Sequence, residues 1–292
     1  MVARAVTIGA VTTSPQHVRA VLGRHGLRPR RALGQNFVAD ANTVRRIARL
    51  AELGPDSRVV EIGAGLGALT VALAETGASV TAVEVDTRLV PVLREAAQGT
   101  AVRVVEADAL TLDWSALLDG VLAGAARPEA ILVANLPYNV AVPVLARVLD
   151  EAPRVTRMLV MVQREVGERL VAVPGSKAYG AVSVKVAYHA EARLVGRVPA
   201  SVFVPRPKVE SVLVRIERRR APAVDPTEVP PARLFALVRA GFGHRRKMLR
   251  GALAGLVPPE AFEAAGIDPA ARAESLSVEE WGRLARCTTP SG

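Results

Sequence analysis

The sequence predicts an α/β fold with a mostly parallel sheet of about seven strands and a small, all-helical C-terminal domain. Apolar runs rich in β-branched residues recur between residues 58 and 163, and helical patterns separate them. Two later apolar runs are joined by a Pro-rich connection without an obvious helix, and residues 232–292 show helical patterns only. Near-continuous apolar strands that alternate with helices are typical of a parallel sheet covered on both faces.

Five apolar runs are the predicted parallel strands of this sheet. They are RVVEIG (58–63), SVTAVEVD (79–86), AVRVVEAD (101–108), AILVAN (130–135) and RMLVMVQ (157–163). Patterns such as LGALTVALAET (66–76) and TRLVPVLREAA (87–97) predict helices between them. The runs AVSVKVAYHA (181–190) and KVESVLVRIE (208–217) are the predicted last pair of strands. Because no helix is expected between them, this pair is predicted to be antiparallel.

Changes in composition divide the chain into four predicted parts. Residues 1–20 are expected to be a flexible N-terminal extension, and residues 21–217 are expected to form the main α/β domain. The segment RRRAPAVDPTEVPP (218–231) is rich in proline and charge, which predicts a linker. Residues 232–292 form the predicted helical C-terminal domain.

Composition also limits the class and the compartment of the protein. Hydrophobic residues make up 50% of the 292 residues, so the chain can bury a sizeable core. No uninterrupted apolar run approaches the roughly 20 residues of a membrane-spanning helix, so no membrane partner is expected. The single cysteine, Cys287, excludes an internal disulfide framework and fits a reducing cytoplasm. The 4 histidines are scattered without the spacing of metal ligands, so no metal site is expected.

The chain carries a formal net charge of +10, which suggests a polyanionic partner. The excess is uneven, because residues 1–46 hold eight arginines against the single acid Asp40. A surface that serves solubility alone normally mixes both signs of charge. Arginine enrichment in a GC-rich genome is an alternative that composition leaves open.

A glycine-rich loop in EIGAGLGALT (61–70) follows the first predicted strand. Ligands in such sheets bind at the carboxyl ends of the strands. Gly63, Gly65 and Gly67 allow a tight turn and a close approach of the backbone to a ligand. Glu84, near the end of the next strand, can accept hydrogen bonds from both hydroxyls of a ribose. Dinucleotide enzymes share these two features, and a glycine turn can also serve packing alone.

The next two strand ends narrow the choice of cofactor. Asp108 closes the third predicted strand, and Asn135 closes the fourth in the sequence NLPYN. An acid at the third strand can bind the amino group of an adenine ring. A nicotinamide enzyme has no particular need for Asn-Leu-Pro-Tyr after the fourth strand. The set of strand ends therefore argues against a dinucleotide enzyme.

With these residues the chain resembles the S-adenosylmethionine-dependent methyltransferases of the Rossmann-like class I. In particular it resembles the bacterial small-subunit (16S) rRNA adenine N6,N6-dimethyltransferases, the KsgA/RsmA family. The glycine loop and NLPY are shared with many relatives, whereas the segments after residue 163 are more selective. The motifs that carry the resemblance are LGQNF (33–37), EIGAGLGALT (61–70), VEVD (83–86), NLPYN (135–139), QREVGERL (163–170), GSKAYGAVSV (175–184), FVPRPKVESVLVRI (203–216), GFGHRRKMLR (241–250) and GIDPAARAESLS (266–277).

The resemblance implies S-adenosylmethionine as the cofactor, and it implies which residues bind it. The residues implied are Asn36, Val38, Gly63, Glu84, Asp108 and Asn135. Gly65 of the glycine loop is added to them as a predicted cofactor-binding residue. In the resemblance, LGQNF closes over the methionine end of the cofactor as a lid. The residues of LGQNF by themselves suggest only a loop before a helix that Asp40 caps.

The turn of Asn135, Leu136, Pro137 and Tyr138 is the predicted catalytic element. The N6 atom of adenine is a poor nucleophile because its lone pair is delocalised into the ring. The amide oxygen of Asn135 and the carbonyl of Leu136 can accept its two N–H bonds and turn the lone pair toward the methyl group. Pro137 keeps the turn rigid, and the ring of Tyr138 can stack on an extruded base. Catalysis then consists of positioning and charge complementarity, without a general base.

The implied partner is 16S rRNA within the small ribosomal subunit or its precursor. A role in subunit maturation is implied as well, and we expect a monomeric, cytoplasmic enzyme. Two basic groups are candidates for contacts with RNA phosphates. They are Arg28, Arg30 and Arg31 before LGQNF, and Arg245, Arg246 and Lys247 in the C-terminal domain.

Two other functions stay open at the level of sequence. One is that of the related enzyme that dimethylates a single adenosine in large-subunit rRNA, in which GSKAYGAVSV and GIDPAARAESLS are not expected. The other is that of an RNA-binding assembly factor that has lost catalysis. The intact set of Gly63, Glu84, Asp108 and Asn135 argues against such a loss.

Overall fold

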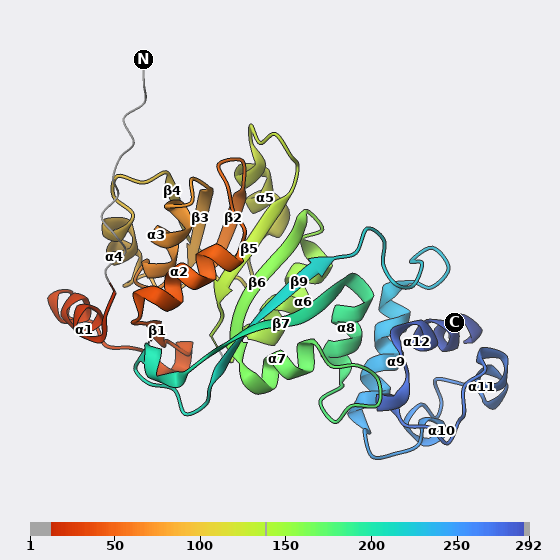
Figure 1. Ribbon diagram of the computed structural model, residues 1–292. Coiled ribbons are helices and arrows are strands. Elements are labelled where there is room, and N and C mark those ends of the chain that lie inside the picture. Colours follow the sequence, from red (N-terminus) through yellow and green to blue (C-terminus); the bar gives the residue numbers. More distant parts are fainter. Residues whose placement is uncertain (1–12, 138, 289–292) are drawn as a thin grey trace. The chain divides into compact units, whose positions relative to one another are not determined.

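The computed structural model describes residues 13–137 and 139–288. The chain forms two compact units (Figure 1). The first unit is Met1–Arg164 with Val195–Arg215, and the second unit is Glu165–Leu194 with Ile216–Gly292. This division differs from the predicted domain boundary at residue 217. The reason is that side chains of the segment before Val195, such as Tyr179, pack into one apolar core with the C-terminal helices.

The central element of the fold is a mixed sheet of seven strands. The strands lie in the order β4-β3-β2-β5-β6-β9-β7. The pairs β2–β3, β3–β4, β2–β5 and β5–β6 are parallel, and β7 and β9 complete the sheet as its antiparallel strands, as predicted. The strands are β2 (Arg58–Ile62), β3 (Ser79–Glu84), β4 (Val102–Glu106), β5 (Ala130–Asn135), β6 (Val155–Gln163), β7 (Ala190–Val198) and β9 (Ser211–Arg218).

The strand order contains a switch point between β2 and β5. After β2 the chain adds β3 and β4 on one side, and it then returns to add β5 and β6 on the other side. At such a point the loops leave two neighbouring strands in opposite directions, and a crevice opens at their carboxyl ends. The glycines of residues 63–67 follow β2, and Leu136 and Pro137 follow β5. The topology therefore brings both predicted motifs to one crevice.

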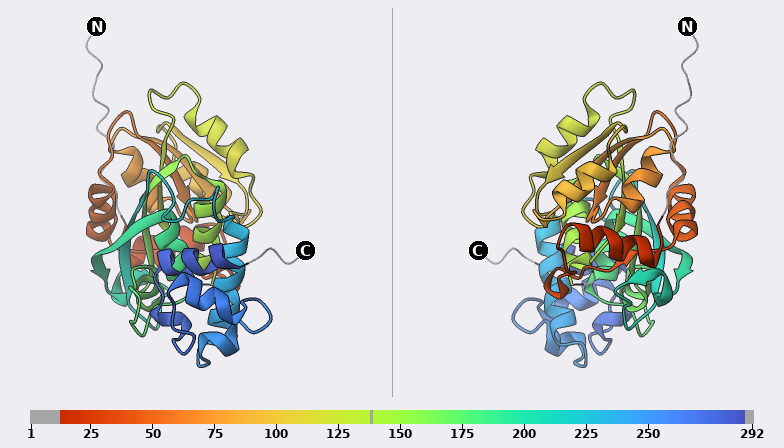
Figure 2. Two further views of the ribbon diagram at one scale, coloured as in Figure 1. Left: turned by 90° about the vertical axis from the view of Figure 1, so that its right-hand side faces the viewer. Right: turned by 90° about the vertical axis from the view of Figure 1, so that its left-hand side faces the viewer.

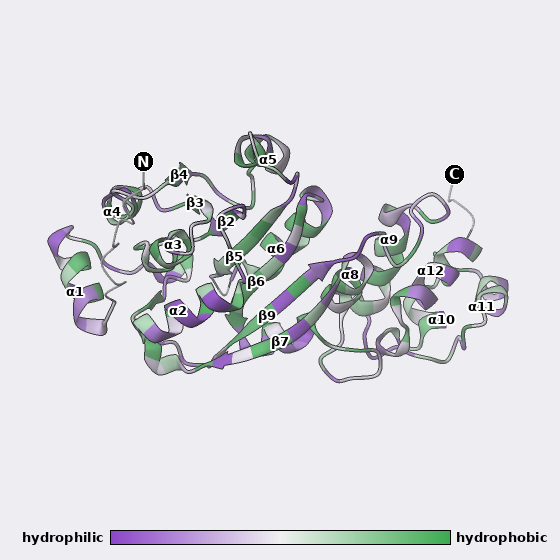
Figure 3. Cartoon of the chain, turned by 45° about the horizontal axis from the view of Figure 1, so that its top comes forward, coloured by the Kyte–Doolittle hydropathy of each residue, from purple (hydrophilic) through white to green (hydrophobic). Residues whose placement is uncertain are grey.

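Helices cover both faces of the parallel part of the sheet. Side chains of α2 and α3 pack against one face, and Figure 1 shows α5 and α6 on the other. In Figure 3, polar and apolar residues alternate along α2, whereas β5 and β6 are mostly apolar. This pattern is expected of a half-exposed helix over a buried sheet. The helices are α2 (Ala41–Leu50), α3 (Ala68–Ala74), α5 (Trp114–Leu122) and α6 (Ala141–Glu151).

The predicted flexible extension of residues 1–20 lies partly outside the described residues, which begin at Thr13, and its described end is helical. Residues Pro15–Arg24 form α1. Its Val18 and Leu22 are buried in an apolar cluster, because their spacing puts both on one face of the helix. Figure 2 (right) shows α1 next to α4 (Val90–Ala96). One face of α1 is therefore buried against other residues of the first unit, among them Phe37 and Leu89.

A short two-stranded sheet anchors the LGQNF motif. The motif begins at the last residue of η1 (Arg31–Leu33) and ends at the first residue of β1 (Phe37–Val38), which pairs antiparallel with β8 (Phe203–Val204). β8 follows the 3-10 turn η2 (Ala200–Val202) in the connection from β7 to β9. The pairing holds the end of LGQNF against a segment that is distant in the sequence.

The second unit is helical apart from the ends of β7 and β9. Its helices surround a core in which Trp281 and Tyr179 are almost fully buried. Val224 and Val229 of the predicted linker lie in the same core. Among the described residues, no helix is both long and apolar enough to cross a membrane. The helical elements are α7 (Arg164–Leu170), α8 (Ala181–His189), α9 (Pro231–Gly243), α10 (Leu249–Ala252), α11 (Pro259–Ala265), η3 (Ala273–Ser275) and α12 (Val278–Cys287).

The prediction of a strand over residues 181–190 is wrong, because these residues form α8 and the strand β7 follows it. Alternating β-branched residues favoured a strand. Two features favour the helix instead. The hydroxyl of Ser183 accepts the N–H of Gly180 at 3.0 Å and donates to the carbonyl of Arg169 at 2.6 Å. Val184 and Tyr188, one helical turn apart, are both buried in the core of the second unit.

Candidate active site

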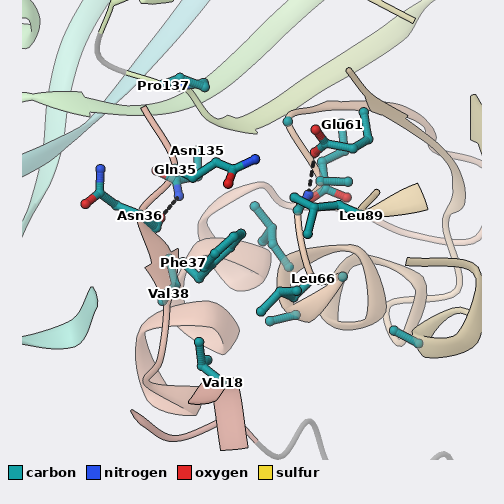
Figure 4. Close-up of a pocket in the computed structure, with 18 of the residues that line it drawn as sticks. Val18, Gln35, Asn36, Phe37, Val38, Glu61, Leu66, Leu89, Asn135 and Pro137 are labelled. Carbon is teal, nitrogen blue, oxygen red and sulfur yellow. Dashed lines mark hydrogen bonds between the residues drawn. The ribbon is translucent and has the colours of Figure 1, made fainter. Parts of the chain in front are cut away.

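A cavity of about 470 Å³ lies in the first unit at the carboxyl ends of β2 and β5 (Figure 4). Its wall combines the glycine loop (residues 63–67), the end of β3, the turn after β5 and part of the lid segment, which we define as residues 30–37. Its volume is in the range of small-molecule and cofactor sites, roughly 300–1,000 Å³. Figure 4 shows Phe37 and Val38 on one side of the cavity, opposite Leu66 and Leu89.

The glycine loop presents backbone to the cavity. The φ angles of Gly63, Gly65 and Gly67 are +72°, +60° and +84°, a region that residues with a Cβ rarely adopt. A Cβ at Gly67 would lie 2.9 Å from the Cβ of Ala96, and a Cβ at Gly65 would lie 3.2 Å from the ring of Phe37. The glycines are therefore required both by the turn and by the close packing around it.

Glu84 places a carboxylate in the wall of the cavity at the end of β3, where it is 5% exposed. Its Oε2 accepts the N–H of Gly65 at 2.8 Å, and its Oε1 accepts the N–H of Asp86 at 2.9 Å. Burial raises the pKa of this carboxyl, and the backbone hydrogen bonds oppose that rise. The two N–H groups fix the carboxylate, and each oxygen can still accept a further hydrogen bond.

Glu61 is a second acid in the cavity wall, and it was not among the site residues predicted from the sequence. It lies in β2 and is 1% exposed. Burial raises its pKa to about 8, so the carboxyl is mostly protonated at neutral pH. Its Oε2 has no hydrogen-bond partner among the described residues. In the sequence, Glu61 stands out as an acid inside an otherwise apolar strand. Buried polar atoms normally have a partner, so an acid at such a position indicates a partner outside the strand, such as a ligand.

The turn after β5 is fixed by hydrogen bonds from several directions. The Nδ2 of Asn135 donates to the main-chain oxygen of Asn36 at 3.2 Å, which orients the amide and leaves its Oδ1 for another partner (Figure 4). The N–H of Leu136 donates to a carbonyl of β6 at 3.1 Å. The carbonyl of Pro137 accepts the N–H of Ala141, the first residue of α6, at 3.0 Å.

The lid segment packs directly on this turn. Gly34 has a φ of +62°, and a Cβ there would lie 3.0 Å from the Cβ of Pro137. The Nδ2 of Asn139 donates to the carbonyl of Ala32 at 3.0 Å. Asn36 and Val38, both predicted from the resemblance, line the cavity. The structure thus brings the two motifs LGQNF and NLPYN together in one wall.

One predicted cofactor-binding residue, Asp108, is not among the described residues that line the cavity. Asp108 follows β4, and its Oδ1 accepts the N–H of Leu110 at 2.8 Å. Arg147 of α6 holds the same loop by donating to the carbonyls of Ala109 and Leu112. Tyr138 lies outside the described residues. The roles of Asp108 and Tyr138 therefore stay predictions.

Residues near the N-terminus also line the cavity, although they were not predicted from the sequence. Thr13, His17, Val18 and Val21 all contribute to its wall. The signal in the sequence was the Ser-Pro pair at residues 14 and 15, since serine is a preferred N-cap and proline a preferred first residue of a helix. Apolar residues at helical spacing follow this pair.

The first predicted RNA-binding group lies just before and at the start of the lid segment. Arg28, Arg30 and Arg31 are all exposed. Arg30 also lies near a buried acid, because its Nη1 is 3.9 Å from the Oδ1 of Asp86. The group therefore adjoins the cavity through the lid segment.

The three residues of the second predicted RNA-binding group, which lies in the second unit, differ in their contacts with the rest of the protein. Arg245 is tied to the protein, because its Nε lies 2.7 Å from Glu274 and its Nη2 donates to the carbonyl of Lys177 at 2.6 Å. Arg246 and Lys247 are exposed in the connection between α9 and α10. The latter two are the better candidates for phosphate contacts.

The sequence matches known proteins over nearly its whole length. The family described as "Ribosomal RNA adenine dimethylase" matches residues 26–289. The protein named "Ribosomal RNA small subunit methyltransferase A" from Cutibacterium acnes is 48% identical, and the match covers 96% of this chain and 95% of that protein. The protein of the same name from Streptomyces coelicolor is 48% identical over 93% of this chain and 95% of its own length.

Solved structures share the fold. The 23S rRNA methyltransferase ErmE has a TM-score of 0.65 at 28% sequence identity, and the match covers 86% of this chain and 98% of ErmE. A dimethyladenosine transferase from Plasmodium falciparum has a TM-score of 0.68 at 22% identity, with 84% of this chain and 94% of that protein covered. The second likeness bears on the fold alone.

Proposed function

Because this chain belongs to the ribosomal RNA adenine dimethylase family, we infer that it methylates the N6 amino groups of two adjacent adenosines near the 3′ end of 16S rRNA. It is an S-adenosylmethionine-dependent rRNA adenine dimethyltransferase. Relatives at 48% identity carry a small-subunit name, whereas the 23S enzyme ErmE is 28% identical. This difference favours the small subunit over the large subunit as the source of the substrate.

The polar groups of the cavity fit S-adenosylmethionine. Glu84 is held by two N–H groups and has free acceptor capacity for the ribose hydroxyls. The glycine loop allows close approach of the ligand to the backbone, and the unpartnered Oε2 of Glu61 indicates that the wall is built for a polar ligand. Asp108 is the proposed partner of the adenine amino group. When bound, S-adenosylmethionine supplies an electrophilic methyl group.

The turn after β5 is proposed to hold the target adenine. Because the Nδ2 of Asn135 is engaged with Asn36, its Oδ1 can accept one N6–H bond, and the carbonyl of Leu136 can accept the other. Accepting both bonds directs the nitrogen lone pair toward the methyl donor. Asn135 and Leu136 thereby favour the tetrahedral nitrogen that forms as the new bond is made. The proposed role of Tyr138 is to stack on the extruded base.

The observation that carries this proposal is that Asn135, Glu84 and the glycine loop meet in one cavity. The test is methyl transfer from labelled S-adenosylmethionine to small subunits that lack the two dimethyladenosines, to large subunits and to naked 16S rRNA. We expect label at two adjacent adenosines of the small subunit. Label in the large subunit alone would show that the substrate is large-subunit rRNA. The absence of label in all three substrates would refute the proposed activity.

The ribosomal context is a further part of the proposal. The RNA substrate is proposed to be presented within the small subunit or its precursor, so methylation would accompany subunit maturation. The enzyme is proposed to act as a monomer in the cytoplasm, where such a substrate is assembled. Sedimentation of the purified protein would test the monomeric state.

Tyr138→Ala is expected to reduce methyl transfer more than Tyr138→Phe. Stacking of one base on an aromatic ring contributes about 1–3 kcal/mol, and phenylalanine keeps the ring. Single-turnover rates on small subunits measure the effect. If the Phe variant is as slow as the Ala variant, the hydroxyl and not the ring is what matters.

Replacing Arg246 and Lys247 together by glutamine is expected to weaken binding to small subunits and to flatten its salt dependence. Each lost phosphate contact lowers the slope of log affinity against log salt by about 0.7–0.9. Leaving Arg245 in place keeps its contacts with Glu274 and Lys177. Binding titrations at several salt concentrations measure the slope.

The matched control for this variant is Arg49→Gln with Arg127→Gln. Both of these arginines are exposed, and they lie near the amino ends of the strands, away from the cavity. The control removes the same net charge and should leave the slope nearly unchanged. Equal slopes for the wild type and the Arg246/Lys247 variant would show that this cluster is only a solvated surface.

A further inference from the structure

Asp86 is a buried carboxylate next to the cavity that the proposed chemistry does not use. It is 2% exposed, and it is not among the residues that line the cavity. Its two oxygens accept hydrogen bonds from the Nε and Nη2 of Arg88 at 3.0 and 2.7 Å, and from the Nε2 of Gln35 at 2.9 Å. The side-chain hydrogen bond from Arg88 lowers the pKa of Asp86 to about 2, so the group is charged at neutral pH.

One side of Asp86 faces the lid segment. Gln35 spans the distance, because its Nε2 donates to Asp86 while its Oε1 accepts the N–H of Arg30 at 2.8 Å. The guanidinium of Arg30 is 3.9 Å from Asp86, and its side chain is 53% exposed. Arg30 is therefore tied to Asp86 twice, through Gln35 and through its own charge, and it still faces solvent.

The other side of Asp86 leads to the ribose carboxylate. The backbone N–H of Asp86 donates to the Oε1 of Glu84 at 2.9 Å. A continuous set of hydrogen bonds thus runs from Glu84 through Asp86 and Gln35 to Arg30. We call Arg30, Gln35, Glu84, Asp86 and Arg88 the Asp86 network.

The far end of the lid segment is held independently. Phe37 and Val38 pair with β8, and Asn36 accepts the hydrogen bond of Asn135. The Asp86 network holds the end that carries Arg30. Loss of Asp86 would therefore release the side chains of Gln35 and Arg30 from their common acceptor, whereas Ala32 would stay held by Asn139 and the cavity end would stay in place.

We propose that Asp86 is a positioning residue that couples binding of the cofactor at Glu84 to binding of RNA at Arg30. Cofactor bound to Glu84 fixes the end of β3 and, with it, the position of Asp86. Asp86 in turn holds Gln35 and Arg30, so that the guanidinium of Arg30 can contact an RNA phosphate. By linkage, the cofactor must then raise the affinity for RNA by the same factor by which RNA raises the affinity for the cofactor. This inference rests on the proposed function.

The test compares the affinity for unmethylated small subunits with and without S-adenosylhomocysteine, which occupies the cofactor site without reacting. For the wild type we expect the ratio to be at least about fivefold, the low end of common coupling strengths. In Asp86→Asn the ratio should fall to nearly one. Asparagine lacks the charge, and its amide places N–H donors against Arg88 or Gln35. A wild-type ratio near one, or an unchanged ratio in Asp86→Asn, would overturn the proposal.

Gln35→Leu is the second variant, and it matters if Asp86→Asn folds poorly. It removes the hydrogen-bonded link from Asp86 to Arg30, but it keeps Asp86 paired with Arg88 and leaves the direct approach of the Arg30 guanidinium to Asp86. Its ratio should therefore fall to between the wild-type value and that of Asp86→Asn. The double variant should match Asp86→Asn, because the two residues act in one network. A Gln35→Leu variant that keeps the wild-type ratio would overturn the proposal independently.

Two controls separate coupling from simple structural damage. Asp113→Asn makes the same change at an acid that caps α5 by accepting the N–H of Ala116 at 3.0 Å, and Gln98→Leu makes the second change at an exposed site after α4. Both should keep the wild-type ratio. If the wild type methylates no small subunit, the proposed function fails; if it methylates normally but shows no coupling, only this inference fails.

Discussion

Asn135→Ala should lower kcat for methyl transfer by about 100- to 1,000-fold, the effect of removing one preorganised hydrogen-bonding group from an active site. The amide oxygen is proposed to accept an N6–H bond, and alanine has no acceptor to replace it. The variant also loses the hydrogen bond from Nδ2 to the oxygen of Asn36, so the target turn and the lid segment lose one of their links. Single-turnover methylation of small subunits with labelled cofactor measures the change.

Asn139→Ala is the matched control for this prediction. Asn139 lies in the same motif, and its Nδ2 also donates to a carbonyl of the lid segment, that of Ala32. It should lower kcat far less, because Asn139 is exposed and does not line the cavity. Cofactor affinity should fall less in Asn135→Ala than in a variant of Glu84. If Asn135→Ala keeps a rate within threefold of the wild type, the amide does not hold the reacting nitrogen.

Glu84→Ala should weaken the binding of S-adenosylmethionine by roughly 10- to 150-fold, which corresponds to about 1.5–3 kcal/mol for hydrogen bonds to a charged group. The carboxylate is proposed to accept the ribose hydroxyls. Its removal also leaves the N–H groups of Gly65 and Asp86 without their acceptor, which loosens the glycine loop. Calorimetric titration with the cofactor measures the loss, and circular dichroism checks that the sheet stays folded.

Glu106→Ala is the matched control for Glu84→Ala. Glu106 is the register partner of Glu84 in the neighbouring strand β4, but it is exposed and does not line the cavity. Its removal should leave cofactor affinity nearly unchanged. Unchanged affinity in Glu84→Ala would instead remove Glu84 from the ribose role.

Much of the site was predictable from the sequence, because it depends on local patterns at strand ends. Parallel strands bring their carboxyl ends to one edge, so Glu84 and Asn135 could be placed together before any coordinates were known. The glycine loop was predictable for the same reason, since its position after a strand identifies the turn. Glu61 could have been found as well, as the acid in an apolar strand.

The helix α8 shows where sequence patterns mislead. Its valines alternate with other residues as in a strand, yet the segment is helical because Val184 and Tyr188 find a common core with the C-terminal helices. Local propensity is weak compared with the burial of several apolar side chains. The division of the chain into two units follows from the same packing and not from the proline-rich segment 218–231.

The sequence by itself determined the α/β class, the glycine turn and the residues at the strand ends. These features depend on backbone geometry and on periodicity within short segments. Only the tertiary structure decided which distant residues meet. Asn135 bonds to Asn36 across 99 positions, and Gln35 bonds to Asp86 across 51. Hydrogen bonds over such separations leave no periodic signal in the chain, because they exist only after the sheet has brought its loops to one edge.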